Sequence, residues 1–171
     1  MHSNEFRNVS IRGRMAFGII CFENALKHFD YDVEDWQMIL RELWSFTEIE
    51  YIDEWLYSFA EYKASSILED LSFSEKGFEK LTRSEYGILK KLYFNSDNLI
   101  QELTDLLFWL GTVEMYGQIV DNSPKTLEEL QKIMNVMATN GIQLPQGSLF
   151  LKFSFTEDGW GKGFTREEVF E

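Results

Sequence analysis

Cysteine and histidine are almost absent from this sequence of 171 residues, which contains one cysteine and two histidines. Because Cys21 stands alone, the chain can form no intrachain disulfide, no CxxC redox pair and no cysteine zinc cluster, and a reducing compartment fits best. His28 follows Cys21 by seven residues, about 10 Å along a helix, which is too far for a Cys/His catalytic pair. The chain also lacks the Glu-x-x-His pairs of di-iron helical bundles.

Basic residues and long hydrophobic runs are also scarce. The chain has 16 Lys and Arg against 29 Asp and Glu, a net charge of −13 and a pI near 4.6. Nucleic-acid binding needs clustered cations, so this composition argues against it. No stretch approaches the ~18 uncharged residues of a membrane span, and the polar first residues lack the pattern of a signal peptide. We therefore expect a cytoplasmic protein that binds neither nucleic acid nor membrane.

Apolar and aromatic residues, in contrast, are plentiful. At 44% hydrophobic and 16% aromatic, the composition is too apolar for a disordered acidic tail. A chain of this length can bury a core without disulfides or structural metal, so we expect one acidic helical domain over residues 1–171, with no cofactor and no metal. The many aromatic residues also leave a symmetric homodimer open.

Apolar residues at steps of three and four predict helices in the first part of the chain. Three helices are expected, over residues 11–29, 33–46 and 47–63. Asp32 is a good N-cap for the second of these helices. Thr47 and Glu50 have the spacing of a capping box, which predicts that the third helix begins there.

The same periodicity continues in the second part of the chain. It predicts a short helix and a turn within 65–77, and further helices over about 82–93, 97–116 and 126–140. Thr82 with Glu85 and Thr126 with Glu129 are capping boxes that mark two of the starts. The helix over 97–116 is so dense in apolar residues that we expect it at the centre of the core.

After Pro145 the apolar residues alternate with the others, a period of two that suits one half-buried strand. No convincing partner strand is present. The expected fold is therefore mainly α: a single-domain bundle of about six helices with a short extended or β-like C-terminal segment. Gly159, Gly161 and Gly163 surround Trp160 in a turn that lacks the spacing of a phosphate-binding loop.

Four of the five tryptophans lie at helical positions. Trp36, Trp44, Trp55 and Trp109 occupy apolar positions, so we expect them in the core, with Trp55 the one partly exposed. Trp160 is expected either to pack on the core or to be exposed to a partner.

Acidic residues are concentrated in one quarter of the chain. Residues 30–70 carry twelve acidic side chains and two basic ones, a net charge of −10. On the third expected helix, four carboxylates and one phenol share the face opposite the apolar one: Glu50, Asp53, Glu54, Tyr57 and Glu61. Like charges at this spacing destabilise a helix by ~0.2–0.5 kcal/mol per pair, so the acidic face favours a binding role. Such a surface can steer and bind a cationic partner.

Three other interpretations are compatible with the same residues. The charge can simply keep the protein dispersed in solution. Glu50 with Asp53, or Glu102 with Asp105, has the spacing to share a Mg²⁺ ion, as in helical nucleotide hydrolases, although no matching second Glu-x-x-Glu precedes them. A general helical adaptor protein would also present an acidic surface.

The segment 153–164, aromatic and glycine-rich, closes a small, acidic, largely helical chain. In this it resembles the immunity proteins of bacterial polymorphic-toxin and contact-dependent growth inhibition systems. The resemblance implies a non-enzymatic inhibitor that binds one cognate toxin domain, often a nuclease. We therefore expect a basic toxin domain as partner, and the expected contact residues are Glu50, Asp53, Glu54, Tyr57, Glu61 and Trp160.

Overall fold

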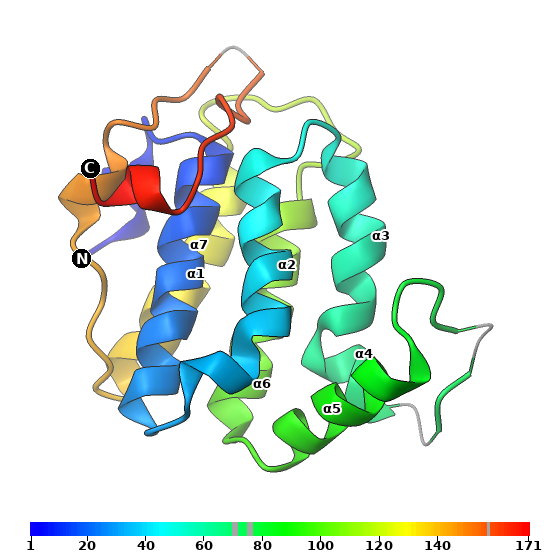
Figure 1. Cartoon of the computed structure of the whole chain (residues 1–171). Helices are drawn as coiled ribbons and strands as arrows, with labels where there is room; N and C mark the ends of the chain where they lie inside the picture. Colours follow the sequence, from blue (N-terminus) through cyan, green and yellow to red (C-terminus); the bar gives the residue numbers. More distant parts are fainter. Residues whose placement is uncertain (70–71, 75–76, 157) are drawn as a thin grey trace.

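The computed structural model describes residues 1–69, 72–74, 77–156 and 158–171, and these residues are mainly helical (Figure 1). Their α-helices are α1 (Ile11–His28), α2 (Gln37–Glu48), α3 (Ile52–Tyr62), α4 (Ala64–Glu69), α5 (Arg83–Phe94), α6 (Asn98–Thr112) and α7 (Pro124–Thr139). Short 3-10 helices are η1 (Ser3–Phe6), η2 (Val33–Trp36), η3 (Gly147–Phe150) and η4 (Glu167–Val169). The expected mainly α fold is confirmed. None of the described helices is long and apolar enough to cross a membrane.

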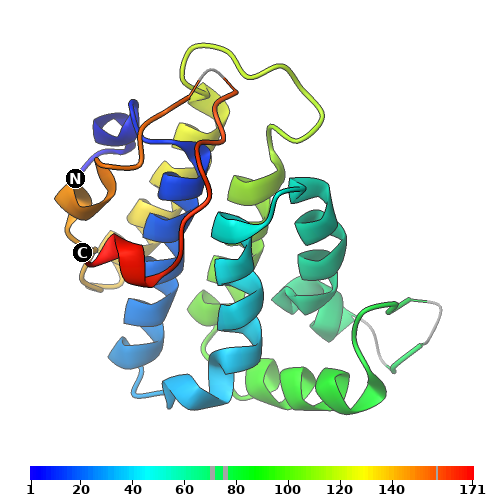
Figure 2. The same cartoon turned by 45° about the horizontal axis from the view of Figure 1, so that its top comes forward.

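Helices α1, α2 and α3 lie side by side in one layer, with α7 and α6 behind them and α5 crossing one end (Figures 1 and 2). Helix α1 is buried on almost every side, because α2, α6, α7 and the C-terminal segment surround it. Helix α6 packs on α1, α7, α3 and α4, as its apolar density predicts, but one of its sides faces outward. The core therefore centres on α1 and the inner side of α6.

Two helical glycines allow these layers to approach closely. A Cβ at Gly18 would lie 2.8 Å from a methyl group of Leu107, so α1 and α6 meet at this point without a side chain between them. A Cβ at Gly111 would lie 2.7 Å from the Trp55 ring, which leaves room for the indole between α3 and α6. Trp55 stacks on Phe59 with the ring centroids 4.9 Å apart and is only 1% exposed. These contacts fix α3 against the core.

The second and third helices begin differently from the prediction. Asp32 caps η2, accepting a hydrogen bond from the Glu34 amide, and α2 follows from Gln37. The Thr47 and Glu50 capping box was wrong: Thr47 is buried near the end of α2, where its hydroxyl donates to the Trp44 carbonyl. Helix α3 begins at Ile52, so Glu50 lies in the connection before it.

The later helix starts give one confirmation and one correction. The Thr82 and Glu85 capping box is present at α5. The box at Thr126 was wrong, because Ser123 is the N-cap of α7 and accepts a hydrogen bond from the Thr126 amide. The expected stop at Asn140 is confirmed. In the predicted short helix of 65–77, α4 covers Ala64–Glu69, and residues 70, 71, 75 and 76 lie outside the described residues.

The C-terminal segment crosses the first turn of α1 instead of joining a sheet. Among the described residues, its β-like part is one antiparallel bridge between Val9 and Ser154. The first amides of α1 then donate to tail carbonyls: Ser10 to Phe153 at 2.8 Å, Ile11 to Gly159 at 3.0 Å and Arg12 to Trp160 at 3.2 Å. The amides at a helix N-terminus have no acceptor within the helix, so the tail carbonyls supply these acceptors for α1. This places the Trp160 loop beside the α2–α3 connection.

Candidate functional site: a pocket and an acidic-aromatic surface

A pocket of about 400 Å³ lies where four segments meet at one end of the bundle, at the top in Figure 1. These segments are the start of α1, the α2–α3 connection, the chain after α6 and the tail loop. The lining residues are Arg12, Glu50, Tyr51, Ile52, Asp53, Met115, Tyr116, Asp158, Trp160 and Gly161. Three residues predicted as partner contacts, Glu50, Asp53 and Trp160, thus come together although the third is over 100 residues from the others.

Arg12 fixes the inner side of this pocket. Its side chain is 6% exposed, and its two terminal nitrogens donate to the carbonyls of Phe46 at 2.5 Å and Ile49 at 2.6 Å. Its Nε is buried and has no hydrogen-bond partner among the described residues. Burial lowers the pKa of the Arg12 guanidinium, and the nearby Asp158 carboxylate partly opposes this effect. The arginine therefore links α1 to the end of α2 and holds the α2–α3 connection in place.

The tail loop is held by Asp158. Its Oδ1 accepts hydrogen bonds from the Thr156 hydroxyl, from the Trp160 amide at 3.0 Å and from the Gly161 amide at 3.4 Å. The Thr156 hydroxyl, the backbone amides and Arg12 lower the pKa of Asp158, so its carboxylate stays charged at neutral pH. Gly161 has φ of +82°, and a Cβ there would lie 2.4 Å from that of Ser10, so the loop requires glycine at this position.

Trp160 combines the two roles that the sequence left open. It is half-buried, packs against Phe46 with the ring centroids 6.3 Å apart, and also lines the pocket. One part of the indole is thus anchored on the core, while another part forms the wall of the pocket. Its backbone amide is also bound by Asp158, so the loop backbone and the ring contact with Phe46 together position this residue.

Beside the pocket, α3 and the chain after α6 form an exposed patch that we term the acidic-aromatic surface. Its residues are Glu50, Tyr51, Asp53, Glu54, Tyr57 and Tyr116. Tyr57 is 60% exposed and Tyr116 is 78% exposed. A hydrogen bond with Tyr57 is the main cause that raises the pKa of the Tyr116 phenol, and the Asp53 carboxylate contributes. Among the described residues, none of the three carboxylates forms an ion pair.

Glu61, the last member of the predicted acidic face, is bound within the protein. Its carboxylate accepts hydrogen bonds from the backbone amides of Glu79, Lys80 and Leu81 at distances of 2.8 to 3.1 Å. It therefore fastens the segment before α5 to the end of α3. The acidic-aromatic surface ends one helical turn earlier, at Tyr57.

The structure confirms some of the tryptophan predictions and contradicts others. Trp36, Trp44 and Trp55 are buried, as expected of core residues, but Trp55 is not the partly exposed one. Its indole nitrogen donates to the Glu42 carbonyl at 2.8 Å, which satisfies its polar atom inside the core. Trp109 was predicted to be buried and is 57% exposed, because it lies on the outward side of α6.

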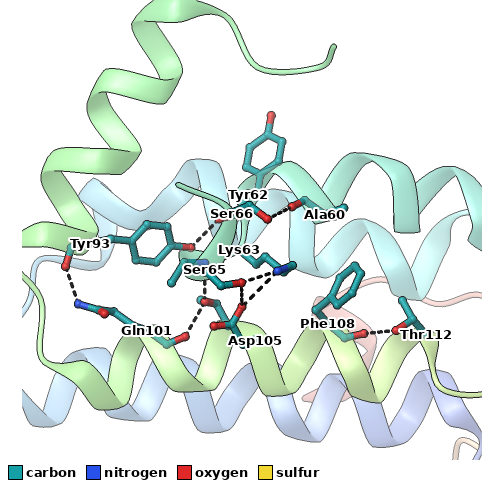
Figure 3. Close-up of polar contacts among 12 residues, drawn as sticks. Ala60, Tyr62, Lys63, Ser65, Ser66, Tyr93, Gln101, Asp105, Phe108 and Thr112 are labelled. Carbon is teal, nitrogen blue, oxygen red and sulfur yellow. Dashed lines mark hydrogen bonds and ion pairs between the residues drawn. The ribbon is translucent and has the colours of Figure 1, made fainter. Parts of the chain in front are cut away.

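A second cluster of polar side chains lies at the corner between α3 and α4 (Figure 3). Ser65 donates to the Asp105 carboxylate at 2.7 Å, and Lys63 donates to Ser65 and lies 3.7 Å from Asp105. The Thr104 hydroxyl accepts from the Ala64 amide at 3.1 Å. Because these groups bond one another and the backbone, the cluster ties the corner to α6.

The cluster includes Asp105, one member of the Glu102 and Asp105 pair that the sequence offered for Mg²⁺. Asp105 is bound to Lys63 and Ser65, while Glu102 is exposed on α6. Among the described residues, no group of three or more His, Cys, Asp or Glu side chains is arranged to hold a metal ion.

Arg12, Tyr116 and Asp158 are among the pocket residues that the sequence did not identify as contacts. Arg12 had a detectable signal, because it precedes Met15 by three residues and so places a charge on the apolar face of the first helix. Buried charges require specific partners and therefore mark positions where the chain is held together. For Tyr116 and Asp158, which lie in connections, the sequence pattern carries no information on which helix end they approach.

Comparison with known proteins adds no assignment. No protein-family model, no curated protein and no solved structure matches this chain. The likeness to immunity proteins therefore stays a prediction.

Proposed function

We propose that this chain is a non-enzymatic inhibitor of the immunity-protein type, which binds a basic toxin domain through the acidic-aromatic surface. The proposal places the protein in the cytoplasm, where its single, buried cysteine stays reduced. The observation that carries it is the combination, on one face, of exposed tyrosines and carboxylates that form no ion pair with any described residue.

The two residue types have separate roles in such an interface. Exposed carboxylates attract a cationic partner at long range and increase its association rate. Tyrosines provide contact area with few rotatable bonds, and they are enriched among the residues that dominate binding energy. Tyr57 and Tyr116 come from separate segments and lie close enough for their phenols to interact, so one partner can cover both rings. The surface thus has both attraction and anchors.

The test is capture of the partner with a variant that changes this surface alone. The tagged protein is mixed with extract from its source cells, or with the product of the neighbouring gene, and washed at increasing salt. We expect one basic polypeptide at equal stoichiometry, whose toxicity the protein blocks. The variant Glu54→Lys with Tyr57→Ala should weaken its binding by about tenfold or more, since it removes a steering charge and an anchor.

The matched control is Glu34→Lys with Phe94→Ala. It also reverses one exposed acid and truncates one exposed aromatic side chain, 79% exposed in the case of Phe94, at sites outside the surface. The control should retain the affinity of the original protein. Equal losses in both variants would contradict the assigned surface. Retention of many unrelated proteins, or a captured partner whose activity is not blocked, would contradict the inhibitor function.

A further inference from the structure

We infer that the pocket beside the acidic-aromatic surface receives one arginine side chain of the basic partner. This inference rests on the proposed function and specifies the contact at its centre. The pocket of about 400 Å³ falls at the small end of the ~300–1,000 Å³ range of ligand pockets, a size suited to one side chain.

The charge of the lining favours a cation. Glu50, Asp53 and Asp158 contribute three carboxylates, whereas Arg12 contributes one positive charge. That guanidinium is directed to the carbonyls of Phe46 and Ile49, and Asp158 lies close enough to offset part of its charge. An incoming cation therefore meets an excess of negative charge.

The aromatic lining distinguishes arginine from other cations. Tyr51, Tyr116 and Trp160 line the pocket together with the carboxylates. A guanidinium group is planar, stacks on aromatic rings and can also bind a carboxylate through two hydrogen bonds. A lysine ammonium is more strongly hydrated and lacks the planar group, so it uses only part of this lining. Guanidinium chemistry matches both features of the pocket.

The pocket is also built before binding. Arg12 holds the α2–α3 connection, and Asp158 holds the tail loop through the Trp160 and Gly161 amides. Both sides of the pocket are thus fixed by contacts within the chain. Preorganisation reduces the entropy lost when a flexible side chain enters.

The test uses short peptides and does not require the natural partner. Acetylated and amidated Gly-Arg-Gly, Gly-Lys-Gly and Gly-citrulline-Gly are titrated into the intact protein. The NMR signal of the Trp160 indole N–H is the readout, assigned with a Trp160→Phe variant. We expect saturable shifts with the arginine peptide, about tenfold weaker binding of the uncharged but equally shaped citrulline peptide, and intermediate binding of the lysine peptide.

Variants locate the site within the protein. Glu50→Gln with Asp53→Asn should weaken the arginine peptide by about tenfold. The control, Glu34→Gln with Glu102→Gln, removes two exposed acids elsewhere and should leave the affinity unchanged. Circular dichroism verifies that each variant is folded.

The outcomes separate this inference from the proposed function. Unchanged Trp160 shifts, equal binding of citrulline, or equal losses in both double variants would overturn the arginine site. The inhibitor function would still stand if the partner remained sensitive to Glu54→Lys with Tyr57→Ala. Conversely, arginine-specific binding at Trp160 without any captured partner would support the site and contradict the inhibitor.

Discussion

Arg14, inside α1, donates five hydrogen bonds, whereas Glu50, Asp53 and Glu54 form no ion pair with any described residue. The Arg14 side chain is wholly buried, so its donors must be satisfied for the fold to form. The three carboxylates are in water and are tolerated without partners. Buried charge in this protein thus holds segments together, whereas the charge of the acidic-aromatic surface has no structural partner among the described residues, which is what the proposed binding role requires.

Replacing the buried arginine should cause the largest loss of stability. Arg14 donates to the carbonyls of Phe6, Arg7, Asn122 and Ser123 and to the Thr126 hydroxyl. Arg14→Met would leave the carbonyls of Arg7 and Asn122 without a donor among the described residues and would remove one donor from each of the other three acceptors. Because a buried unpaired acceptor costs ~1–3 kcal/mol, we expect the free energy of unfolding to fall by about 2–5 kcal/mol. Chemical denaturation measures the loss.

The control for this experiment is Arg41→Met. Arg41 is an exposed arginine of the acidic region, and its replacement should change stability by less than about 0.5 kcal/mol. A small effect of Arg14→Met would show that the buried network is dispensable.

Glu61 and Glu54 allow the same contrast within one helix. Glu61→Ala removes the acceptor of three backbone amides, so the free energy of unfolding should fall by about 1.5–3 kcal/mol. Glu54→Ala should leave stability within about 0.5 kcal/mol. Thermal denaturation of both variants measures the difference. Equal effects would remove the distinction between a structural and an available carboxylate on α3.

Reversing the exposed carboxylates should change the affinity for the partner and not the stability of the fold. Glu50→Lys with Asp53→Lys should weaken the partner by more than the ~1 kcal/mol typical of charges at an interface rim, while the fold survives. The control Glu34→Lys with Glu102→Lys changes the net charge equally at other exposed sites. Calorimetry with the captured partner measures both affinities, and an unchanged affinity in the first variant would place the interface elsewhere.

Asp158 is exposed but holds the tail loop, so its replacement should have the smallest effect on stability, and this effect should depend on pH. Its pKa is lowered in the folded protein, so the charged form stabilises the loop above the ordinary value of about 3.9. This stability is lost as the pH falls through the lowered pKa. Asp158→Asn should therefore reduce the melting temperature at pH 6, and the gap from the original protein should close in acid. A constant gap down to pH 2 would assign the loop's stability to other contacts.

The helices could be predicted because their signals are local. The first helix, expected over 11–29, is α1 (Ile11–His28), and the capping box at Thr82 is present at α5. A helix that buries one face needs apolar residues at steps of three and four, whatever it packs against. Periodicity therefore identified most helices, but it carried no information on which neighbour each face meets.

The errors arise where a distant segment decides the outcome. Helix α2 continues through Thr47 to Glu48, and Arg12, from α1, binds the carbonyls of Phe46 and Ile49 at its end, so the expected capping box does not form there. The backbone amides of residues 79–81 bind the Glu61 carboxylate. These residues follow α4 in the sequence, so nothing near Glu61 on α3 indicates the contact. Trp109 is exposed since its side of α6 faces outward. None of these contacts leaves a local spacing in the sequence.

The candidate site was predicted in part for the same reason. Glu50, Asp53, Glu54 and Tyr57 were detectable from the local concentration of acid on one face. That Trp160 would join Glu50 and Asp53 in one pocket depends on the tail crossing α1, which is a long-range contact. The aromatic and glycine-rich composition of the tail indicated a special loop but not its neighbours.

The tail carbonyls that cap α1 also set the order in which this protein can be completed during its synthesis. A ribosome releases α1 early, yet the acceptors for Ser10, Ile11 and Arg12 belong to residues 153–160. Domains are completed as the necessary residues emerge, so the first turn of α1 and the pocket wall close together and late. A nascent chain stopped before this point carries the acidic face of α3 without the Trp160 wall. The proposed arginine site therefore requires the chain through residue 160.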